Sequence, residues 1–376
     1  MGSSLALHTI LKTVHSKIYQ EQFERKAEKL QSMLAAYDAP KISCFASPEI
    51  NYRQRAEFRI WHSGSSTSQN SANYAMYKKG SKELYTIDQL PVACKAINQL
   101  MPPLIDAINA SEILKHRLFS LEFLSTLSGE MLVTLIYHRP LDSEWEEAGR
   151  ALQDKFGIQL IGRSRKQKLC LATDYVTEEL SIKGKKYRYR QIEGSFTQPN
   201  AFINQQMISW AMEQTGIQKT DLLELYCGNG NFTIPLASQF NRVLATEVSK
   251  TSIKALNWNI QANQVTNLEC ARLAAEEISD ALKKVRPFRR LQNIDIDNYR
   301  FSHILVDPPR AGLDSKTLSF VQNFDNIIYI SCNPESLAEN LKQLCQSHKI
   351  TAAAFFDQFP STEHMESGVY LQKVSD

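Results

Sequence analysis

The sequence predicts an α/β protein whose second half forms a doubly wound, mostly parallel sheet and whose first half is a smaller, mixed α+β region. After residue 190, short apolar runs alternate with helical stretches, which is the pattern of successive strand–helix–strand units. Before it, short strand-like segments alternate with turn-rich links. The charge changes at the same place: residues 1–190 carry 27 Lys and Arg against 20 Asp and Glu, and residues 191–376 carry 16 against 20. We therefore expect one region over residues 1–190 and a second over residues 191–376.

The first region is expected to begin with an amphipathic helix over residues 16–35, where apolar side chains recur at helical spacing. The polar link over residues 62–73 is expected to be an exposed loop. Further helices are predicted over residues 92–109 and 143–155. The predicted strands form an antiparallel sheet and cover residues 55–61, 74–77, 119–126, 130–137 and 157–161.

The second region is expected to contain parallel strands with helices between them. Its last two apolar runs, residues 351–359 and 368–374, are separated by a short link, which indicates a closing antiparallel hairpin. The parallel strands are predicted over residues 222–227, 242–248, 268–273, 303–307 and 326–332.

Composition excludes several classes of protein. Hydrophobic residues make up 43% and charged residues 22% of the 376 residues, as in ordinary globular proteins. No run approaches the ~18 apolar residues of a membrane span, and the N-terminus lacks the pattern of a signal peptide, so we expect a cytoplasmic protein. The seven cysteines are scattered and none has C-x-x-C spacing. We therefore expect no disulfide, metal site or iron–sulfur cluster.

Basic residues of the first region gather in clusters at 53–59, 78–82, 163–168 and 183–190. Such clusters suit a polyanion, because neutralising phosphates supplies the sequence-independent part of nucleic-acid affinity. A solvated basic face is the alternative.

A first motif spans residues 222–237, LLELYCGNGNFTIPLA. An apolar strand ends in a Gly-Asn-Gly turn at 228–230, and glycine lets a ligand approach the backbone closely. A dinucleotide site favours a third glycine, and Thr233 stands at that position. Glu247 follows about 20 residues later, where an acidic residue can accept hydrogen bonds from both ribose hydroxyls of an adenosine. The pair favours S-adenosylmethionine over NAD, and a strand–helix turn without a ligand is the alternative.

A second motif, ILVDPPRAGLD at 304–314, runs a strand straight into two prolines. The prolines make the chain leave the sheet rigidly at its carboxyl edge, where open α/β sheets bind ligands. Asp307 is therefore expected beside the cofactor and the target base, with a buried structural turn as the alternative.

A third motif, IIYISCNPESLAENL at 327–341, delivers Cys332 to the same edge, and Pro334 opens a helix. A thiol near a helix N-terminus is expected to have a lowered pKa, and the thiolate is the reactive form. Cysteine is also among the more buried and inert residues, and only its place next to the DPPR strand indicates reactivity.

A fourth motif, FPSTEHMESGVYL at 359–371, places Glu363, His364 and Glu366 just before the last strand. A carboxylate partly desolvated near a cofactor is a suitable general base. Solvated loop charges are the alternative.

Together these segments resemble the RNA uracil-5-methyltransferase family, and the similarity to its tRNA branch extends over most of the chain. The resemblance implies an RNA-binding region followed in the sequence by a Rossmann-like class I S-adenosylmethionine-dependent methyltransferase domain. The segments that carry it are YRQRAEFRIWH, FTQPNAFINQQM, LLELYCGNGNF, DPPRAGLD, YISCNPESL, FDQFP and HMESGVYL.

The resemblance also implies roles for individual residues. Cys332 would add to C6 of a uracil, and Glu366 would remove the proton from C5. The family's cofactor positions fall on Gln198, Tyr226, Asn231, Glu247 and Asp307, and the glycine turn adds Gly228. Composition alone does not lead to Gln198.

The implied substrate is the T-loop uridine of tRNA, conventionally position 54, which would become 5-methyluridine. This base is stacked in its loop and must be extruded before a thiolate reaches C6. Phe119, beside Arg117, is a candidate to stack in its place, and Arg59 is a candidate phosphate contact; an ordinary core phenylalanine is the alternative for Phe119. We expect a monomer that binds the T-arm, and other RNAs with a T-like loop stay open.

Three other functions compete with this one. Ribosomal-RNA members of the family typically carry clustered cysteines for an iron–sulfur cluster, which this sequence lacks, so the tRNA branch is favoured. Amino-group methylation of adenine or guanine also uses DPP-type motifs but needs no cysteine. A non-catalytic tRNA-binding or folding factor on a methyltransferase scaffold would not need Cys332, Glu366 and the glycine turn together.

Overall fold

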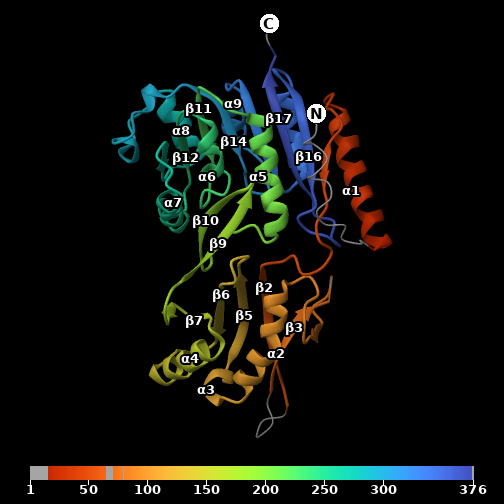
Figure 1. Cartoon of the computed structure of the whole chain (residues 1–376), viewed down its shortest axis with the longest axis vertical. Helices are drawn as coiled ribbons and strands as arrows, with labels where there is room; N and C mark the ends of the chain where they lie inside the picture. Colours follow the sequence, from red (N-terminus) through yellow and green to blue (C-terminus); the bar gives the residue numbers. More distant parts are fainter. Residues whose placement is uncertain (1–15, 65–70, 79, 375–376) are drawn as a thin grey trace.

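A computed structural model describes residues 16–64, 71–78 and 80–374 (Figure 1). The start of the chain, where we expect no signal peptide, and residues 65–70 of the polar link at 62–73 lie outside the described residues. The two ends of that link belong to strands and not to the expected loop, because residues 62–63 pair with 71–72. None of the helices in the described part of the chain combines the length and apolar character that a membrane crossing needs.

The larger sheet has eight described strands and confirms the predicted doubly wound architecture. Strands β13, β12, β11, β14 and β15 run parallel, and β17 runs antiparallel to both β15 and β16. The closing hairpin expected from the last two apolar runs is thus present. In spatial order the strands are β1 (Ser43–Phe45), β16 (His348–Phe356), β17 (Glu366–Lys373), β15 (Asn326–Ser331), β14 (Phe301–Val306), β11 (Asp221–Leu225), β12 (Val243–Thr246) and β13 (Leu268–Ala271).

Helices cover both faces of this sheet, which explains why its central strands are continuous apolar runs. In β15, Ile327 and Tyr329 pack into one core while Ile328 and Ile330 pack into the other. The first core lies under α1 (Lys17–Ala35), α8 (Ala275–Leu282), α9 (Ser315–Val321) and α10 (Pro334–Leu344). The second lies under α5 (Ala201–Thr215), α6 (Thr233–Leu236) and α7 (Lys250–Ala262).

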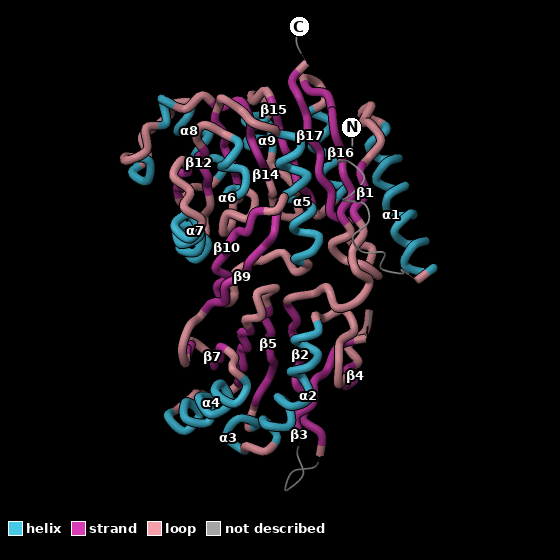
Figure 2. Tube along the Cα trace, in the orientation of Figure 1, coloured by secondary structure: helices cyan, strands magenta, loops and turns pink. Residues whose placement is uncertain are grey.

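The smaller sheet lies at the other end of the long axis of the molecule and carries its helices on one face (Figure 2). Because α4 connects β6 to β7, these two strands run parallel, so the sheet is mixed where the sequence predicts an antiparallel one. Its strands are, in order, β4 (Leu84–Thr86), β3 (Ser71–Tyr77), β2 (Arg55–Ser63), β5 (Leu118–Ser125), β6 (Met131–Tyr137), β7 (Gln159–Ser164) and β8 (Gln167–Cys170). Its helices are α2 (Lys95–Asn109), α3 (Glu112–Lys115) and α4 (Ser143–Phe156).

The two sheets do not divide the chain at residue 190, where the sequence predicts a boundary. From before that residue, β1 adds to the larger sheet beside β16, and Leu30 and Leu34 of α1 pack into one of its cores. The hairpin of β9 (Tyr175–Ile182) and β10 (Lys185–Ile192), which sequence reasoning did not predict, also packs on the larger sheet's side, against α5 and α7. β1 has only three residues and is placed by its pairing with the edge strand β16. A strand this short gives no pattern in the sequence, so its position follows from tertiary pairing.

Candidate active site

The predicted site residues meet at the carboxyl edge of the parallel strands, on the side that faces the smaller sheet. Two adjoining pockets lie there and share Phe196, Gln198, Tyr226, Gly228 and Asp307 as lining residues. All eight residues expected to act in catalysis or cofactor binding line one or both of them: Cys332, Glu366, Gln198, Tyr226, Gly228, Asn231, Glu247 and Asp307.

The glycine turn after β11 has the backbone conformation that its sequence suggests. Gly228 and Gly230 have φ angles of +55° and +87°, and Tyr226 also has a positive φ, of +59°. A Cβ atom added at Gly230 would lie 2.5 Å from the Leu256 side chain, so this position requires glycine. The turn is therefore fixed in shape by both backbone and packing.

Glu247 lies just after the end of β12 and is held by backbone donors. Its carboxylate accepts hydrogen bonds from the Gly228 N–H at 3.1 Å and the Ser249 N–H at 2.7 Å. These bonds hold the carboxylate beside the glycine turn, where Glu247 lines the larger of the two pockets. Such a placement suits an acceptor for ribose hydroxyls.

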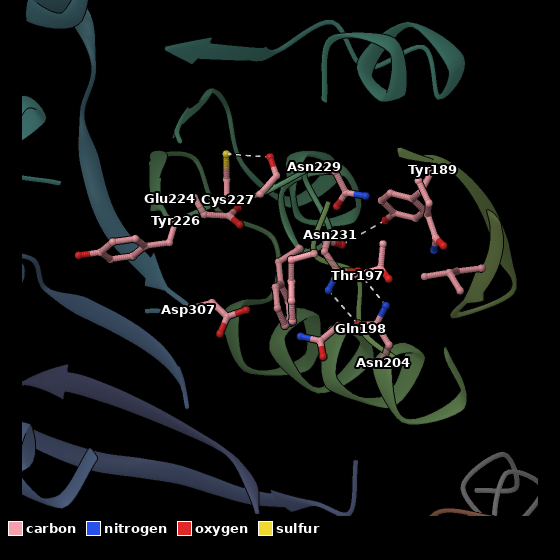
Figure 3. A pocket seen from close by; sticks show the side chains of 15 residues that line it. Tyr189, Thr197, Gln198, Asn204, Glu224, Tyr226, Cys227, Asn229, Asn231 and Asp307 are labelled. Atoms are coloured by element: carbon pink, nitrogen blue, oxygen red, sulfur yellow. Dashed lines mark hydrogen bonds between the residues drawn. The ribbon is translucent and has the colours of Figure 1, made fainter. Parts of the chain in front are cut away.

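The amide side chains of the other pocket are paired with each other (Figure 3). The carboxamides of Asn231 and Asn204 exchange two hydrogen bonds of 2.8 Å. The Tyr189 hydroxyl donates to the backbone carbonyl of Asn231 at 3.1 Å. Gln198 accepts a bond of 2.7 Å from the Nε2 of Gln358. Each predicted amide contact therefore has a partner that sets its orientation.

Cys332 lies between the end of β15 and the start of α10, which Asn333 caps by accepting from the Glu335 N–H at 3.2 Å. The sequence predicts a lowered thiol pKa from this helix terminus, and that prediction is wrong. Burial, followed by the nearby carboxyls of Glu366 and Asp307, raises the pKa of Cys332 to about 11. The thiol is half-buried and must lose its proton before it can act as a nucleophile.

Glu366 opens β17 and is 3% exposed. Its Oε1 has no hydrogen-bond partner among the described residues. Burial, and then the charge of Asp307, raises the pKa of Glu366 well above its ordinary value. Burial also raises the pKa of Asp307 from 3.8 to about 7. The pocket thus contains two interacting carboxyl groups that burial tends to keep protonated.

Asp307→Asn is expected to raise the thermal stability of the protein at pH 8. In the folded chain Asp307 keeps its proton up to about pH 7, whereas the unfolded chain releases it near the ordinary pKa of 3.8. The folded state therefore loses stability as the pH rises between these values, and asparagine removes that loss. We expect a melting temperature about 2–5 °C above the original at pH 8, measured by calorimetry.

The advantage of Asp307→Asn should shrink as the pH falls toward 4, where the carboxyl is protonated in both states. The exposed Asp325 offers a matched control, since Asp325→Asn should change the melting temperature little at any pH. An equal gain from Asp307→Asn at pH 8 and pH 4 would mean that packing, not titration, is responsible.

Arg59 and Phe119 lie together on the smaller sheet, away from the two pockets. The Arg59 guanidinium carbon is 3.8 Å from the centroid of the Phe119 ring, and the His138 ring stacks on Phe119 at 3.8 Å. Phe58 and Ile60, the neighbours of Arg59 in β2, point into the core under the helices, so Arg59 lies on the open face. Sequence reasoning did not identify His138.

Phe196 and Glu224 are among the pocket residues that sequence reasoning missed. Phe196 is 74% exposed, although it lines both pockets. Glu224 is buried in β11, and burial raises its pKa to about 8. A carboxyl within the apolar run LLELY was the available signal for Glu224, because such a run buries both of its faces.

The side chains at these pockets fit S-adenosylmethionine. Glu247 suits the ribose, and the carboxyls of Asp307 and Glu224 suit a ligand with a sulfonium and an ammonium group. The carboxamides of Gln198 and Asn231 offer donors to the ligand's carboxylate. Among the described residues, no group of three or more His, Cys, Asp and Glu side chains is arranged to hold a metal ion.

Comparisons with known proteins agree with this fit. The family model described as tRNA (Uracil-5-)-methyltransferase matches residues 18–374. A tRNA/tmRNA (uracil-C(5))-methyltransferase of Acinetobacter baylyi is 51% identical, and the match covers 96% of this chain and 100% of the relative. The protein of the same name from Neisseria meningitidis is 52% identical, with 94% and 97% covered.

Among solved structures, the Pyrococcus abyssi tRNA (uracil-54, C5)-methyltransferase in complex with S-adenosyl-L-homocysteine superimposes with a TM-score of 0.70. The match covers 94% of this chain and 83% of that chain at 21% sequence identity, so it shows a common fold. A family model that spans nearly the whole chain, and relatives at half identity over their full length, lead to one conclusion. The chain belongs to the tRNA (uracil-5-)-methyltransferase family.

Proposed function

We propose that this chain transfers a methyl group from S-adenosylmethionine to C5 of a uridine in tRNA. The observation that carries the proposal is that Cys332, Glu366 and Asp307 line one pocket together with Glu247 and the glycine turn. The proposed target is the T-loop uridine, at the position that the name of the Pyrococcus abyssi enzyme gives as 54.

Nucleoside analysis of tRNA tests the proposal directly. Cells that lack this chain are expected to contain tRNA without 5-methyluridine, and the purified chain is expected to restore it in the presence of S-adenosylmethionine. Unchanged 5-methyluridine in those cells, together with no incorporation of labelled methyl groups into unmodified tRNA, would contradict the assignment.

The cofactor, when bound, supplies a methyl group from a positively charged sulfonium. Glu247 would hold its ribose, and Gln198, Tyr226 and Asn231 would line its remaining length. Asp307 would face the positive charge of the cofactor, and a neighbouring cation favours the ionised form of a carboxyl group. Binding of the cofactor is therefore expected to lower the raised pKa of Asp307.

Cys332 would act as the nucleophile, because C5 of uracil is too electron-poor to accept a methyl group unaided. The thiol first loses its proton to solvent, so that Glu366 is still available as a base for the last step. A bond then forms between its Sγ and C6, and the C5=C6 electron pair moves into an enolate that makes C5 nucleophilic. After C5 has been methylated, Glu366 takes the C5 proton, the C5=C6 bond re-forms and the Cys332 thiolate leaves C6.

The part of the chain before residue 190 is proposed to contact the RNA. The target base must leave its stack to reach the half-buried Cys332, and the place that it vacates needs a substitute. Phe119 lies between Arg59 and His138 on the open face of the smaller sheet, so a base of the T-arm is proposed to stack on Phe119 by replacing one of these two side chains. The guanidinium of Arg59 can also neutralise a phosphate.

Phe119→Ala is expected to weaken binding of unmodified tRNA by about 5–150-fold, since one base–aromatic stack is worth roughly 1–3 kcal/mol. Fluorescence anisotropy with labelled tRNA measures the effect. Phe288 is a matched control, because Arg286 lies over its ring at 4.2 Å and both residues line a different pocket. Equal losses of affinity from Phe119→Ala and Phe288→Ala would remove the specific role of Phe119.

Three further parts of the proposal are finer than the family assignment. The chain is proposed to act as a monomer, in the cytoplasm, and on the T-arm of tRNA. Because a T-like loop is a local structure, other RNAs that contain one are proposed as additional substrates. Methylation of an isolated T-arm stem-loop by the purified chain would support recognition of this local fold.

A further inference from the structure

The loop between β16 and β17 starts with two buried polar residues and ends at Glu366. Asp357 is 1% exposed and Gln358 is fully buried, which is unusual for the first residues of a loop. The Asp357 N–H donates to the Phe45 carbonyl at 3.0 Å and so extends the pairing of β1 with β16. Buried polar side chains need partners, and those of this loop come from distant parts of the chain.

The partner of Gln358 is Gln198 in the cofactor pocket. Gln358 Nε2 donates to Gln198 Oε1 at 2.7 Å. Because the oxygen of the Gln198 carboxamide accepts this bond, its nitrogen remains as the donor that faces the pocket. In Figure 3 this nitrogen points toward the side on which Asp307 lies. A donor at this place matches the carboxylate of the cofactor's amino-acid end.

The ionic partner of Asp357 is Lys26, a lysine on α1 that is 2% exposed. Its Nζ lies 2.8 Å from Asp357 Oδ1 and donates a second bond of 3.1 Å to the carbonyl of Phe359. One buried ammonium group thus fixes the residues on both sides of Gln358. Four residues earlier on α1, Gln22 accepts from the Ser361 N–H at 2.8 Å.

We propose that Gln358 is a positioning residue that orients the Gln198 carboxamide for the cofactor, and that the Lys26–Asp357 ion pair of α1 holds Gln358 in place. This inference rests on the proposed function of the pocket. It assigns to α1, at the start of the chain, a role in cofactor affinity: α1 braces the loop that leads from Gln358 to Glu366.

The test measures the affinity of the purified full chain for S-adenosylhomocysteine by calorimetry, which requires no turnover. Gln358→Met keeps the side chain's length but removes the donor, and the affinity is expected to fall about 5–20-fold. The affinity for tRNA and the melting temperature should change little. A residue with a merely structural role would lower the melting temperature and leave the affinity of the folded fraction unchanged.

A double-mutant cycle shows whether Gln358 acts through Gln198. If it does, Gln358→Met should weaken binding in the original chain but add nothing in the Gln198→Ala background. Full additivity of the two substitutions would overturn this part of the proposal. Binding of S-adenosylhomocysteine by Gln358→Met at the original affinity would overturn it as well.

The brace is tested by Lys26→Met combined with Asp357→Leu. Lys26→Met alone would leave a buried carboxylate without its cationic partner and can fail to fold, whereas removing both charges preserves folding more often. The double variant should still weaken binding of S-adenosylhomocysteine several-fold. Arg25→Met is the matched control, because Arg25 pairs with Glu363 of the same loop at 2.6 Å on the exposed surface.

The outcomes separate this inference from the proposed function. An original chain that binds no S-adenosylhomocysteine would contradict the proposed function itself. An original chain that binds it, with a folded Lys26→Met/Asp357→Leu variant that binds it equally well, would overturn only the brace.

Discussion

Cys332→Ala is expected to reduce methyl transfer to tRNA by at least about 10⁴-fold, because alanine cannot form the bond to C6 that makes C5 nucleophilic. The reduction should appear in kcat, since the substitution removes a chemical step. Affinities for tRNA and S-adenosylhomocysteine should stay within a few-fold of the original. Incorporation of labelled methyl groups into unmodified tRNA measures the rate.

The covalent bond itself can be observed with tRNA that contains 5-fluorouridine. Fluorine takes the place of the C5 hydrogen, and a base cannot remove it. The elimination that frees Cys332 is therefore blocked, so the adduct should persist on a denaturing gel and be absent from Cys332→Ala. Cys345→Ala is a matched control, because Cys345 is also half-buried and burial also raises its pKa to about 11. Full turnover by Cys332→Ala would instead support amino-group methylation, which needs no nucleophile.

Sequence reasoning located the central strands of the larger sheet because both of their faces are buried. Ile327 to Ile330 alternate between two cores, and such a strand is a continuous apolar run that stands out in the sequence. The β9–β10 hairpin was missed for the opposite reason. Glu178 occupies a position that faces inward in β9 and is 1% exposed, which breaks the alternation of apolar and polar residues.

The site was predictable where chemistry follows from the end of a strand. Glu247, Asp307 and Cys332 each follow a parallel strand, and such ends meet at one edge of a sheet. Gln198 follows no strand of the larger sheet, and only the family resemblance identified it. The predicted direction of the Cys332 pKa shift was wrong because burial, and after it the carboxyls of Glu366 and Asp307 on other strands, act on the thiol only in the folded chain.

Glu366→Gln is expected to stop the reaction after methylation rather than before it. Glutamine is close in size and keeps the buried site filled, but it cannot accept the C5 proton that must leave before Cys332 can separate from C6. A covalent adduct between Cys332 and the methylated tRNA should therefore accumulate, even when the tRNA contains no 5-fluorouridine. Turnover should fall by about 10³-fold or more. A denaturing gel with methyl-labelled cofactor detects the adduct.

The pH dependence distinguishes loss of the base from a general disturbance of the site. Because burial and Asp307 raise the pKa of Glu366 well above its ordinary value, the original chain should release product faster as the pH rises and the carboxyl loses its proton. Glutamine does not titrate, so this part of the rise should be absent from Glu366→Gln. Glu363→Gln, at an exposed position three residues earlier, should release product at the original rate and keep the rise. Turnover of Glu366→Gln at the original rate without an adduct would mean that another group, with Asp307 as the nearest candidate, takes the C5 proton.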